Sequence, residues 1–428
     1  MTLKRNILAN YLGAGSIALI PILALPWYLQ ALGLKQFGLI GIVVMLQAVL
    51  GLLDAGTSQA LMREVTVRLD ATDTGFRRAA FLLFGFERVY WLFALGAGCL
   101  ILALSDVIAT QWLDFKELPI DLGRSALYGA AVLFAVQFPG SVYRSVLVAA
   151  QAQVALNGIM FCGALARHVG GVIVVFAWPT LTAYLAWHAL IALLETLTRA
   201  RFAWKALNVK RAHLYWKTGE LRPVWRPVAS MSGAAWLGAL TIQVDRIVLS
   251  RTASIEQFGY YTIAVMVATG VLQLVYPLVQ AVLPQAIQLR THPAALRILS
   301  FKLMGIVGLL SLLGALIFFT SGNWMLHKWL SNQEAATAIF PILAILLLGT
   351  ALNAFYNVGY VNWLVEEKTH RVFQVNALAL VLSVALTPVF VTHFGVIGAA
   401  FGWLMINLIG FVLSLEWVIQ KQQNDRKS

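Results

Sequence analysis

The sequence predicts an all-α polytopic membrane protein, with twelve transmembrane helices in two six-helix lobes around a central cavity. Three observations lead to this fold class: the composition, the number of long apolar stretches and an internal repeat. Of the 428 residues, 60% are hydrophobic and 11% are charged, whereas a soluble domain carries about 25% charged residues. A soluble chain of this length cannot remove so much apolar surface from water. The composition therefore excludes a soluble enzyme, a disordered chain and a disulfide scaffold.

Twelve apolar stretches are long enough to cross a bilayer, which requires about 20 residues. They run over 8–32, 38–60, 80–104, 125–147, 154–177, 180–203, 228–250, 258–284, 302–326, 337–361, 372–392 and 396–419. The chain then divides into an N-terminal lobe (1–204), a cytoplasmic linker (205–227) and a C-terminal lobe (228–428). Because the segments between the spans are short, any function is expected within the membrane or in short loops.

The positive side chains lie mostly on one side of the predicted spans. With the N-terminus inside, 22 of the 31 lysines and arginines fall in inner segments and five fall in outer ones. Inner loops of membrane proteins carry this excess, so both termini are predicted to be cytoplasmic. The inner charges suit anionic membrane lipids. Because they are spread over seven short segments, nucleic-acid binding is not expected.

The two halves of the sequence resemble each other. Residues 34–42 align with residues 255–263 at an offset of 221, and both contain Gln-Phe-Gly. Each half has an even number of predicted spans, so both halves enter the membrane from the same side. Such parallel repeats are related by an axis along the membrane normal, and rocking of one half against the other gives alternating access. The architecture favours a transporter over a channel or an enzyme.

Four arginines fall inside predicted spans, namely Arg88, Arg144, Arg167 and Arg246. Each charged side chain costs about 2.5–3.5 kcal/mol at the bilayer centre on insertion scales. The arginines must therefore face a wet cavity, pair with acids or extend to the interface. The acids in the spans are Asp54, Glu87, Glu195 and Asp245. Neighbours on a helix do not face one another, so Glu87 and Asp245 each need a partner other than the arginine that follows them.

Two interpretations of these charges stay open, structural ion pairs or a cationic cavity wall with separate protonatable acids. Polar residues recur at helical spacing in the same spans and include Gln137, Asn157, Asn353 and Asn357. They either line a cavity or serve helix packing. No pair of histidines, acids or cysteines has the spacing of a metal site. No phosphate loop or nucleophile elbow is present, so we predict no catalytic residue, no metal and no cofactor.

Three segments resemble the oligosaccharide flippases of the Wzx type. They are residues 32–65 (with Lys35-Gln36-Phe37-Gly38), residues 137–157 (with Gln137-Phe138-Pro139-Gly140) and residues 243–261 (with Gln243-Val244-Asp245-Arg246). These flippases belong to the superfamily of multidrug, oligosaccharide-lipid and polysaccharide exporters. The resemblance implies twelve helices in two lobes around a cationic lumen. It also implies transfer of an undecaprenyl-diphosphate-linked glycan from the cytoplasmic to the periplasmic leaflet of the bacterial inner membrane, alongside a polysaccharide polymerase.

On this hypothesis the four arginines bind the diphosphate, because guanidinium groups grip phosphate oxygens bidentately. Gln137, Asn157, Asn353 and Asn357 then line the cavity. Coupling to H⁺ or Na⁺ falls to Asp245, Glu195, Glu87 or Asp54, listed from the sequence alone.

Two alternatives remain. A multidrug cation antiporter of the same superfamily would want an acidic or aromatic pocket. A polytopic glycan polymerase or ligase would be expected to carry catalytic groups on a large periplasmic loop. The longest outer loop here, about 105–124, has the acids Asp106, Asp114, Glu117 and Asp121 but no basic partner motif.

Overall fold

The computed structural model describes residues 3–54, 56–69, 73–113, 119–209, 233 and 235–418, and these residues are helical apart from short connections. The chain divides into two compact units, Met1–Ala239 and Leu240–Ser428. The predicted linker, 205–227, begins within the last turn of a helix that ends at Leu207, and its part beyond residue 209 lies outside the described residues.

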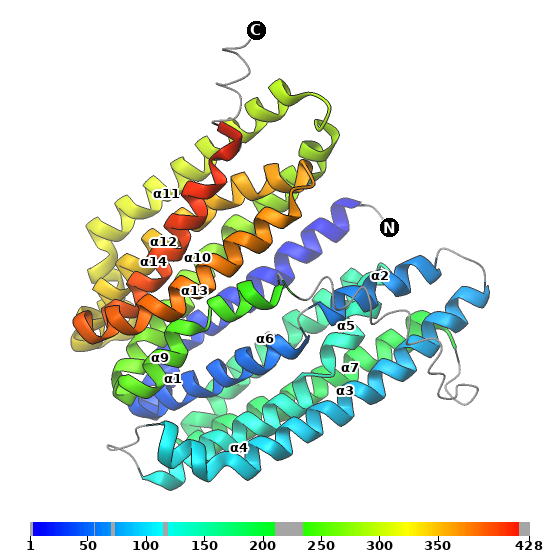
Figure 1. Ribbon diagram of the computed structural model, residues 1–428. Helices are drawn as coiled ribbons and strands as arrows, with labels where there is room; N and C mark the ends of the chain where they lie inside the picture. The colour runs from blue at the N-terminus through cyan, green and yellow to red at the C-terminus, as the bar shows by residue number, and fades with distance from the viewer. Residues whose placement is uncertain are drawn as a thin grey trace. The chain divides into compact units, whose positions relative to one another are not determined.

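The first unit is a helical bundle (Figure 1). Its elements are α1 (Leu3–Gly51), the 3₁₀ turn η1 (Leu52–Asp54), α2 (Thr57–Leu69), α3 (Asp73–Val107), the π-helical turn η2 (Ile108–Trp112), α4 (Ile120–Gln137), α5 (Gly140–Ala149), α6 (Gln153–Ala177) and α7 (Leu181–Leu207). Helix α6 packs on α1 and on α7, and α7 also packs on α4 and on α5. The side chains of α6 and α7 that face each other are therefore held in a common interior.

The second unit is also built from helices (Figure 1). They are α9 (Val244–Thr252), α10 (Ile255–Gln288), α11 (Pro293–Leu330), α12 (Gln333–Val365), α13 (Thr369–Phe394) and α14 (Val396–Ser414). Helix α12 occupies the middle of this unit, since it packs on α10, α11 and α14. Helix α10 begins with a capping box, in which Ser254 and Gln257 exchange side chain to backbone hydrogen bonds.

Ten helices among the described residues are long and apolar enough to cross a membrane. The protein is thus an all-helical, multi-pass membrane protein. Two differences separate these ten from the twelve predicted spans. The first two predicted spans lie in one helix, α1, and the predicted span 228–250 lies partly outside the described residues, where α9 covers only Val244–Thr252.

Helix α1 is interrupted at Gly33. The backbone there has φ 75° and ψ 165°, a conformation that side chains other than glycine's rarely adopt. The turn predicted at residues 33–36 therefore coincides with a break between two helical stretches. The repeat segment 34–42 follows this break, and its counterpart 255–263 follows the Ser254 cap, so both copies begin a helix.

Close packing of α12 on α14 depends on glycine. A Cβ atom added at Gly359 would lie 2.4 Å from the Ser414 Cβ, and one added at Gly349 would lie 2.5 Å from the Trp403 ring. Small residues that let two backbones approach are the usual basis of helix association in membranes, where no hydrophobic force drives helices together. These two glycines therefore set the distance between α12 and α14.

Replacement of Gly359 by alanine is expected to destabilise the second unit, because the added methyl group has no room against Ser414. Overpacking of this kind costs about 1–3 kcal/mol. The free energy of unfolding in mixed detergent micelles measures the loss. Gly314→Ala in α11 is the matched control, since nothing lies within 4 Å of its added Cβ. Equal stability of the two variants would contradict the packing argument.

Candidate functional site

The first unit contains a buried cluster of two arginines around one carboxylate. The Arg167 Nη2 atom of α6 lies 2.6 Å from Glu195 Oε2 of α7, and Arg199 Nη2 contacts the other oxygen, Glu195 Oε1. The side chains are 21% (Arg167), 10% (Glu195) and 15% (Arg199) exposed. Each oxygen of Glu195 thus accepts from a different guanidinium group, and the carboxylate ties α6 to α7.

Two glycines give this cluster its space. A Cβ atom at Gly163 of α6 would lie 3.0 Å from the Glu195 carboxyl carbon. One at Gly140, the first residue of α5, would lie 3.2 Å from Arg199 Nη1. The helices can therefore approach closely enough for the charged ends of Glu195 and Arg199 to be enclosed between them.

A third arginine adds to the positive charge. Arg144 of α5 is exposed and lies close enough to Arg199 for their charges to interact. Arg144, Arg167 and Arg199 against the single acid Glu195 leave an excess of two positive charges. We call these four residues the arginine cluster.

The arginine cluster lies far from the helix ends. Arg167 stands ten residues before the end of α6 and Glu195 twelve residues before the end of α7, or about 15 and 18 Å along the helix axes at 1.5 Å per residue. Both helices are among those able to span a membrane. Charges at such positions are rare and mark functional sites or internal pairs.

The two paired arginines keep unused donors. Among the described residues, neither Arg167 Nε nor Arg199 Nε has a hydrogen-bond acceptor, although both atoms are buried. Buried polar groups without partners are uncommon in folded proteins. The arginine cluster can therefore accept further negatively charged atoms.

Arg88, another predicted cation, lies on α3 and is exposed. Its guanidinium carbon stands 3.8 Å from the centroid of the Phe84 ring, a cation–π contact. It borders a cavity of about 620 Å³ whose lining includes Phe84, Glu87, Arg88, Trp91, Leu92 and Leu95.

Arg246 lies on α9 in the second unit, with Nη1 3.5 Å from Gln243 Oε1. No ion pair joins it to another residue in the described part of the chain. Its position relative to the arginine cluster stays outside what the separate units define.

The acids Glu87 and Asp54 have hydroxyl and indole partners. Glu87 accepts from the Tyr143 hydroxyl at 2.7 Å and from the Trp204 indole at 3.2 Å, so its partners lie on other helices as expected. Asp54 accepts from the Ser58 and Tyr90 hydroxyl groups, each at 2.5 Å. No ion pair joins Asp54 to another described residue.

Asp245 of α9 has a similar environment in the second unit. One of its oxygens accepts from the Arg246 backbone N–H at 2.7 Å, and the other accepts from the Tyr261 hydroxyl. Asp54 and Asp245 therefore share a tyrosine hydroxyl as a donor, although they lie in different units.

The predicted polar residues of the second unit form a hydrogen-bonded set between two helices. Asn353 donates to the Asn407 side chain at 2.7 Å, and Asn357 donates to the Asn353 side chain at 3.0 Å. Asn407 of α14 was not among the predicted residues, and its place opposite Asn353 depends on the packing of α12 on α14. In the first unit, Asn157 is buried in α6, and Gln137 is exposed at the end of α4.

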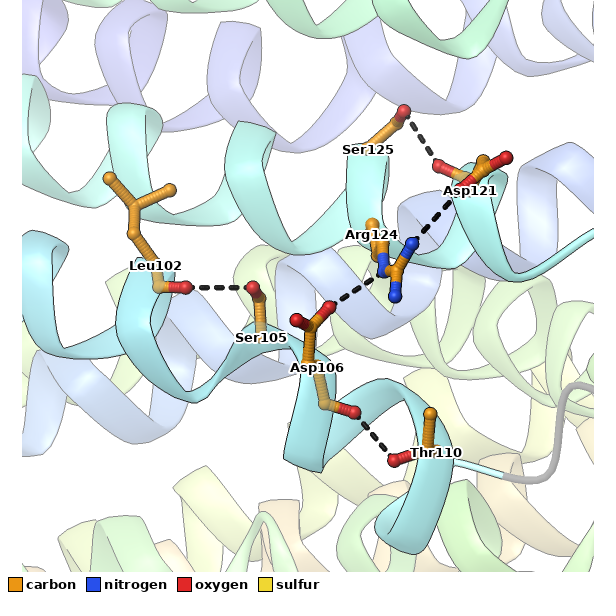
Figure 2. Close-up of polar contacts among 7 residues, drawn as sticks. All are labelled: Leu102, Ser105, Asp106, Thr110, Asp121, Arg124 and Ser125. Carbon is orange, nitrogen blue, oxygen red and sulfur yellow. Dashed lines mark hydrogen bonds and ion pairs between the residues drawn. The ribbon is translucent and has the colours of Figure 1, made fainter.

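The outer segment between α3 and α4 contains an ion-pair network (Figure 2). Arg124 Nε lies 2.6 Å from Asp106 Oδ1, and Arg124 Nη1 lies 3.2 Å from Asp121 Oδ1. The expectation that these acids have no basic partner was wrong, because the arginine comes from the following helix. Asp114 and Glu117 lie outside the described residues.

Sequence reasoning also missed Arg199, which was counted with the cytoplasmic positive charges. Its spacing of four residues from Glu195 places both side chains on one helix face, and this was the available signal. In the described part of the chain, no group of three or more histidines, cysteines or acids could hold a metal ion.

The chain has the fold of the MOP superfamily transporters. It is similar to an inward-facing multidrug resistance MATE family transporter (15% identity, TM-score 0.67, covering 100% of this chain and 96% of the other). It is also similar to the lipid II flippase MurJ in an inward closed conformation (14%, 0.70, 96% and 86%). A third similar structure is a MOP superfamily transporter from Pyrococcus furiosus (13%, 0.61, 99% and 97%). No family model and no curated protein matches the sequence.

The asparagine contact between α12 and α14 is expected to stabilise the second unit. In a double-mutant cycle, Asn353→Ala and Asn407→Ala should lose less stability together than the sum of their separate losses, because both remove the same hydrogen bond. Such bonds in membrane proteins average about 0.6 kcal/mol. Unfolding in mixed micelles measures the coupling, with Asn323→Ala in exposed α11 as the control. Strictly additive losses would show that the bond contributes nothing.

Proposed function

We propose that the protein is a flippase for an undecaprenyl-diphosphate-linked oligosaccharide, which it moves from the cytoplasmic to the periplasmic leaflet of the bacterial inner membrane. The observation that carries this proposal is the excess of two positive charges in the arginine cluster. An uncompensated charge within a spanning bundle is costly, and it is best explained by a negatively charged cargo.

The chemistry of the head group fits the cluster. A diphosphate that joins a lipid to a sugar carries one negative charge on each phosphate, so its charge equals the excess of the cluster. Guanidinium groups form paired hydrogen bonds with phosphate oxygens. Arg144, Arg167 and Arg199 would hold the diphosphate, while the polyprenyl tail stays in the bilayer.

Transport would follow alternating access, with the two units rocking about the substrate. On this proposal both termini are cytoplasmic, Arg88 and Arg246 contribute to the cationic path, and Gln137, Asn157, Asn353 and Asn357 serve the glycan or the packing around it. The protein would work among membrane lipids and beside a polysaccharide polymerase that uses the translocated glycan.

Asp54 and Asp245 are the proposed coupling residues. Each carboxylate accepts from a tyrosine hydroxyl, and Asp54 has a serine hydroxyl in addition. A carboxylate among hydroxyl groups can bind a proton or coordinate Na⁺ through oxygen atoms. Glu87 and Glu195 are weaker candidates for coupling, because each is engaged by donors from neighbouring helices.

A multidrug cation antiporter is the second candidate, and the environment of Asp54 favours it. This carboxylate has no ion pair with another described residue, so it could attract an organic cation. Efflux of a cationic dye from cells that express the protein would support the antiporter. A glycan polymerase or ligase is the third reading, and the ion pairs of Arg124 with Asp106 and Asp121 reduce its support, since they engage these acids.

Replacement of Arg167 by alanine is expected to slow translocation about 10–100-fold, the value of one charge-assisted hydrogen-bonding group. The measurement is the translocation of undecaprenyl-diphosphate-linked glycan in proteoliposomes, together with complementation of a flippase-null strain. Lys328→Ala, which changes a positive residue at the end of α11, is the control. Full complementation by the Arg167 variant at normal expression would refute its role.

Replacement of Asp245 or Asp54 by asparagine is expected to make transport independent of the ion gradient, because an amide neither binds a proton nor neutralises Na⁺. Transport in vesicles, with and without imposed H⁺ and Na⁺ gradients, tests this expectation. Asp106→Asn, which alters the outer ion-pair network, is the control. If both variants keep the gradient dependence of the native protein, these carboxylates do not couple transport.

A further inference from the structure

Glu195 occupies donors that a phosphate group would use. Its two oxygens each bind one guanidinium group, from α6 and from α7. Two oxygens of a phosphate can accept from two arginines in the same way. The carboxylate of Glu195 thus stands where a phosphate would be bound.

The charged groups around Glu195 are mostly positive. Arg167 faces it from α6 and Arg199 from α7, and Arg144 of α5 lies within range of Arg199. On the α6 side, Gly163 leaves the carboxylate in contact with backbone rather than with a side chain. Among the described residues, Glu195 is the acid that forms ion pairs with Arg167 and Arg199.

We propose that Glu195 is a built-in counter-anion, which holds Arg167 and Arg199 while the site is free of ligand and is displaced by an incoming diphosphate. This inference rests on the proposed function. In the empty protein, the carboxylate lowers the cost of enclosing two guanidinium groups. In the loaded protein, the phosphate oxygens take over both groups and the Nε donors that Glu195 leaves unused.

Displacement of Glu195 would also select the ligand. A single monovalent anion gains too little from two guanidinium groups to replace a carboxylate that is already held there. A diphosphate carries charge on two phosphates and can engage Arg144 as well as Arg167 and Arg199. Glu195 therefore raises the discrimination between a diphosphate and smaller anions.

The test measures binding of inorganic pyrophosphate to the detergent-purified full chain by titration calorimetry at constant ionic strength. Glu195→Gln keeps the size of the side chain and removes the competing charge. It is expected to bind pyrophosphate about tenfold more tightly than the native protein, because a ligand no longer has to displace a competitor. Sulfate is expected to gain affinity by a larger factor, so that the discrimination between the two anions falls.

Glu64→Gln is the matched control, because Glu64 also pairs with an arginine four residues away, Arg68, but on α2. It should leave both affinities unchanged. Gly163→Ala provides an independent variant that retains every charge. Its added Cβ would lie 3.0 Å from the Glu195 carboxyl group, so it should push the carboxylate away and tighten pyrophosphate binding as well. This variant keeps the proposal testable if Glu195→Gln does not fold.

A second arm uses undecaprenyl diphosphate in the same micelles, which separates a lipid-linked ligand from a free one. Tighter binding of both ligands by the Glu195 and Gly163 variants would support the proposal. Unchanged or weaker pyrophosphate binding in folded variants would overturn it, whether or not the native protein transports glycan. Conversely, if the variants bind both diphosphates more tightly but no glycan is translocated, the proposed flippase function fails and the counter-anion role of Glu195 stands.

Discussion

The arrangement of the first unit depends on the cost of placing a guanidinium group in an apolar bundle. Arg167 stands near the middle of α6, where neither water nor lipid head groups are within easy reach. Glu195 compensates part of its charge, but the same carboxylate also serves Arg199. With Arg144 nearby, the compensation is incomplete, and the remaining positive charge is the strongest chemical property of this unit. The proposed cargo, the role of Glu195 and the need for Gly163 all follow from this imbalance.

The two units use glycine and polar side chains in different ways. In the second unit, Gly349 and Gly359 bring α12 against α14, and the asparagines at this contact satisfy one another. In the first unit, Gly140 and Gly163 make room for charged ends. Polar residues that recur at helical spacing therefore have no single meaning. Asn353 and Asn357 hydrogen-bond within a packed pair of helices, whereas the arginine cluster keeps donors without acceptors in the described part of the chain.

Local sequence properties were enough to predict the helical class and many of the spans. Apolar stretches of sufficient length mark most of the ten candidate helices, and Gly33 marks the break in α1 because only glycine adopts its backbone conformation readily. The sequence also identified Arg167 and Glu195 as deep charges. It could not assign their partners. Arg199 was grouped with the cytoplasmic positive charges, and Arg124 was not recognised as the partner of Asp106.

The sequence by itself determined that the chain is a multi-pass helical membrane protein with charges inside its spans. This follows because hydropathy and span length act locally, along one helix at a time. Only the tertiary structure decided which charges share a site. Arg167 and Glu195 are 28 residues apart and Asn353 and Asn407 are 54 apart, so each contact exists only because two helices pack in one register. Side-chain packing, which no single segment encodes, sets that register.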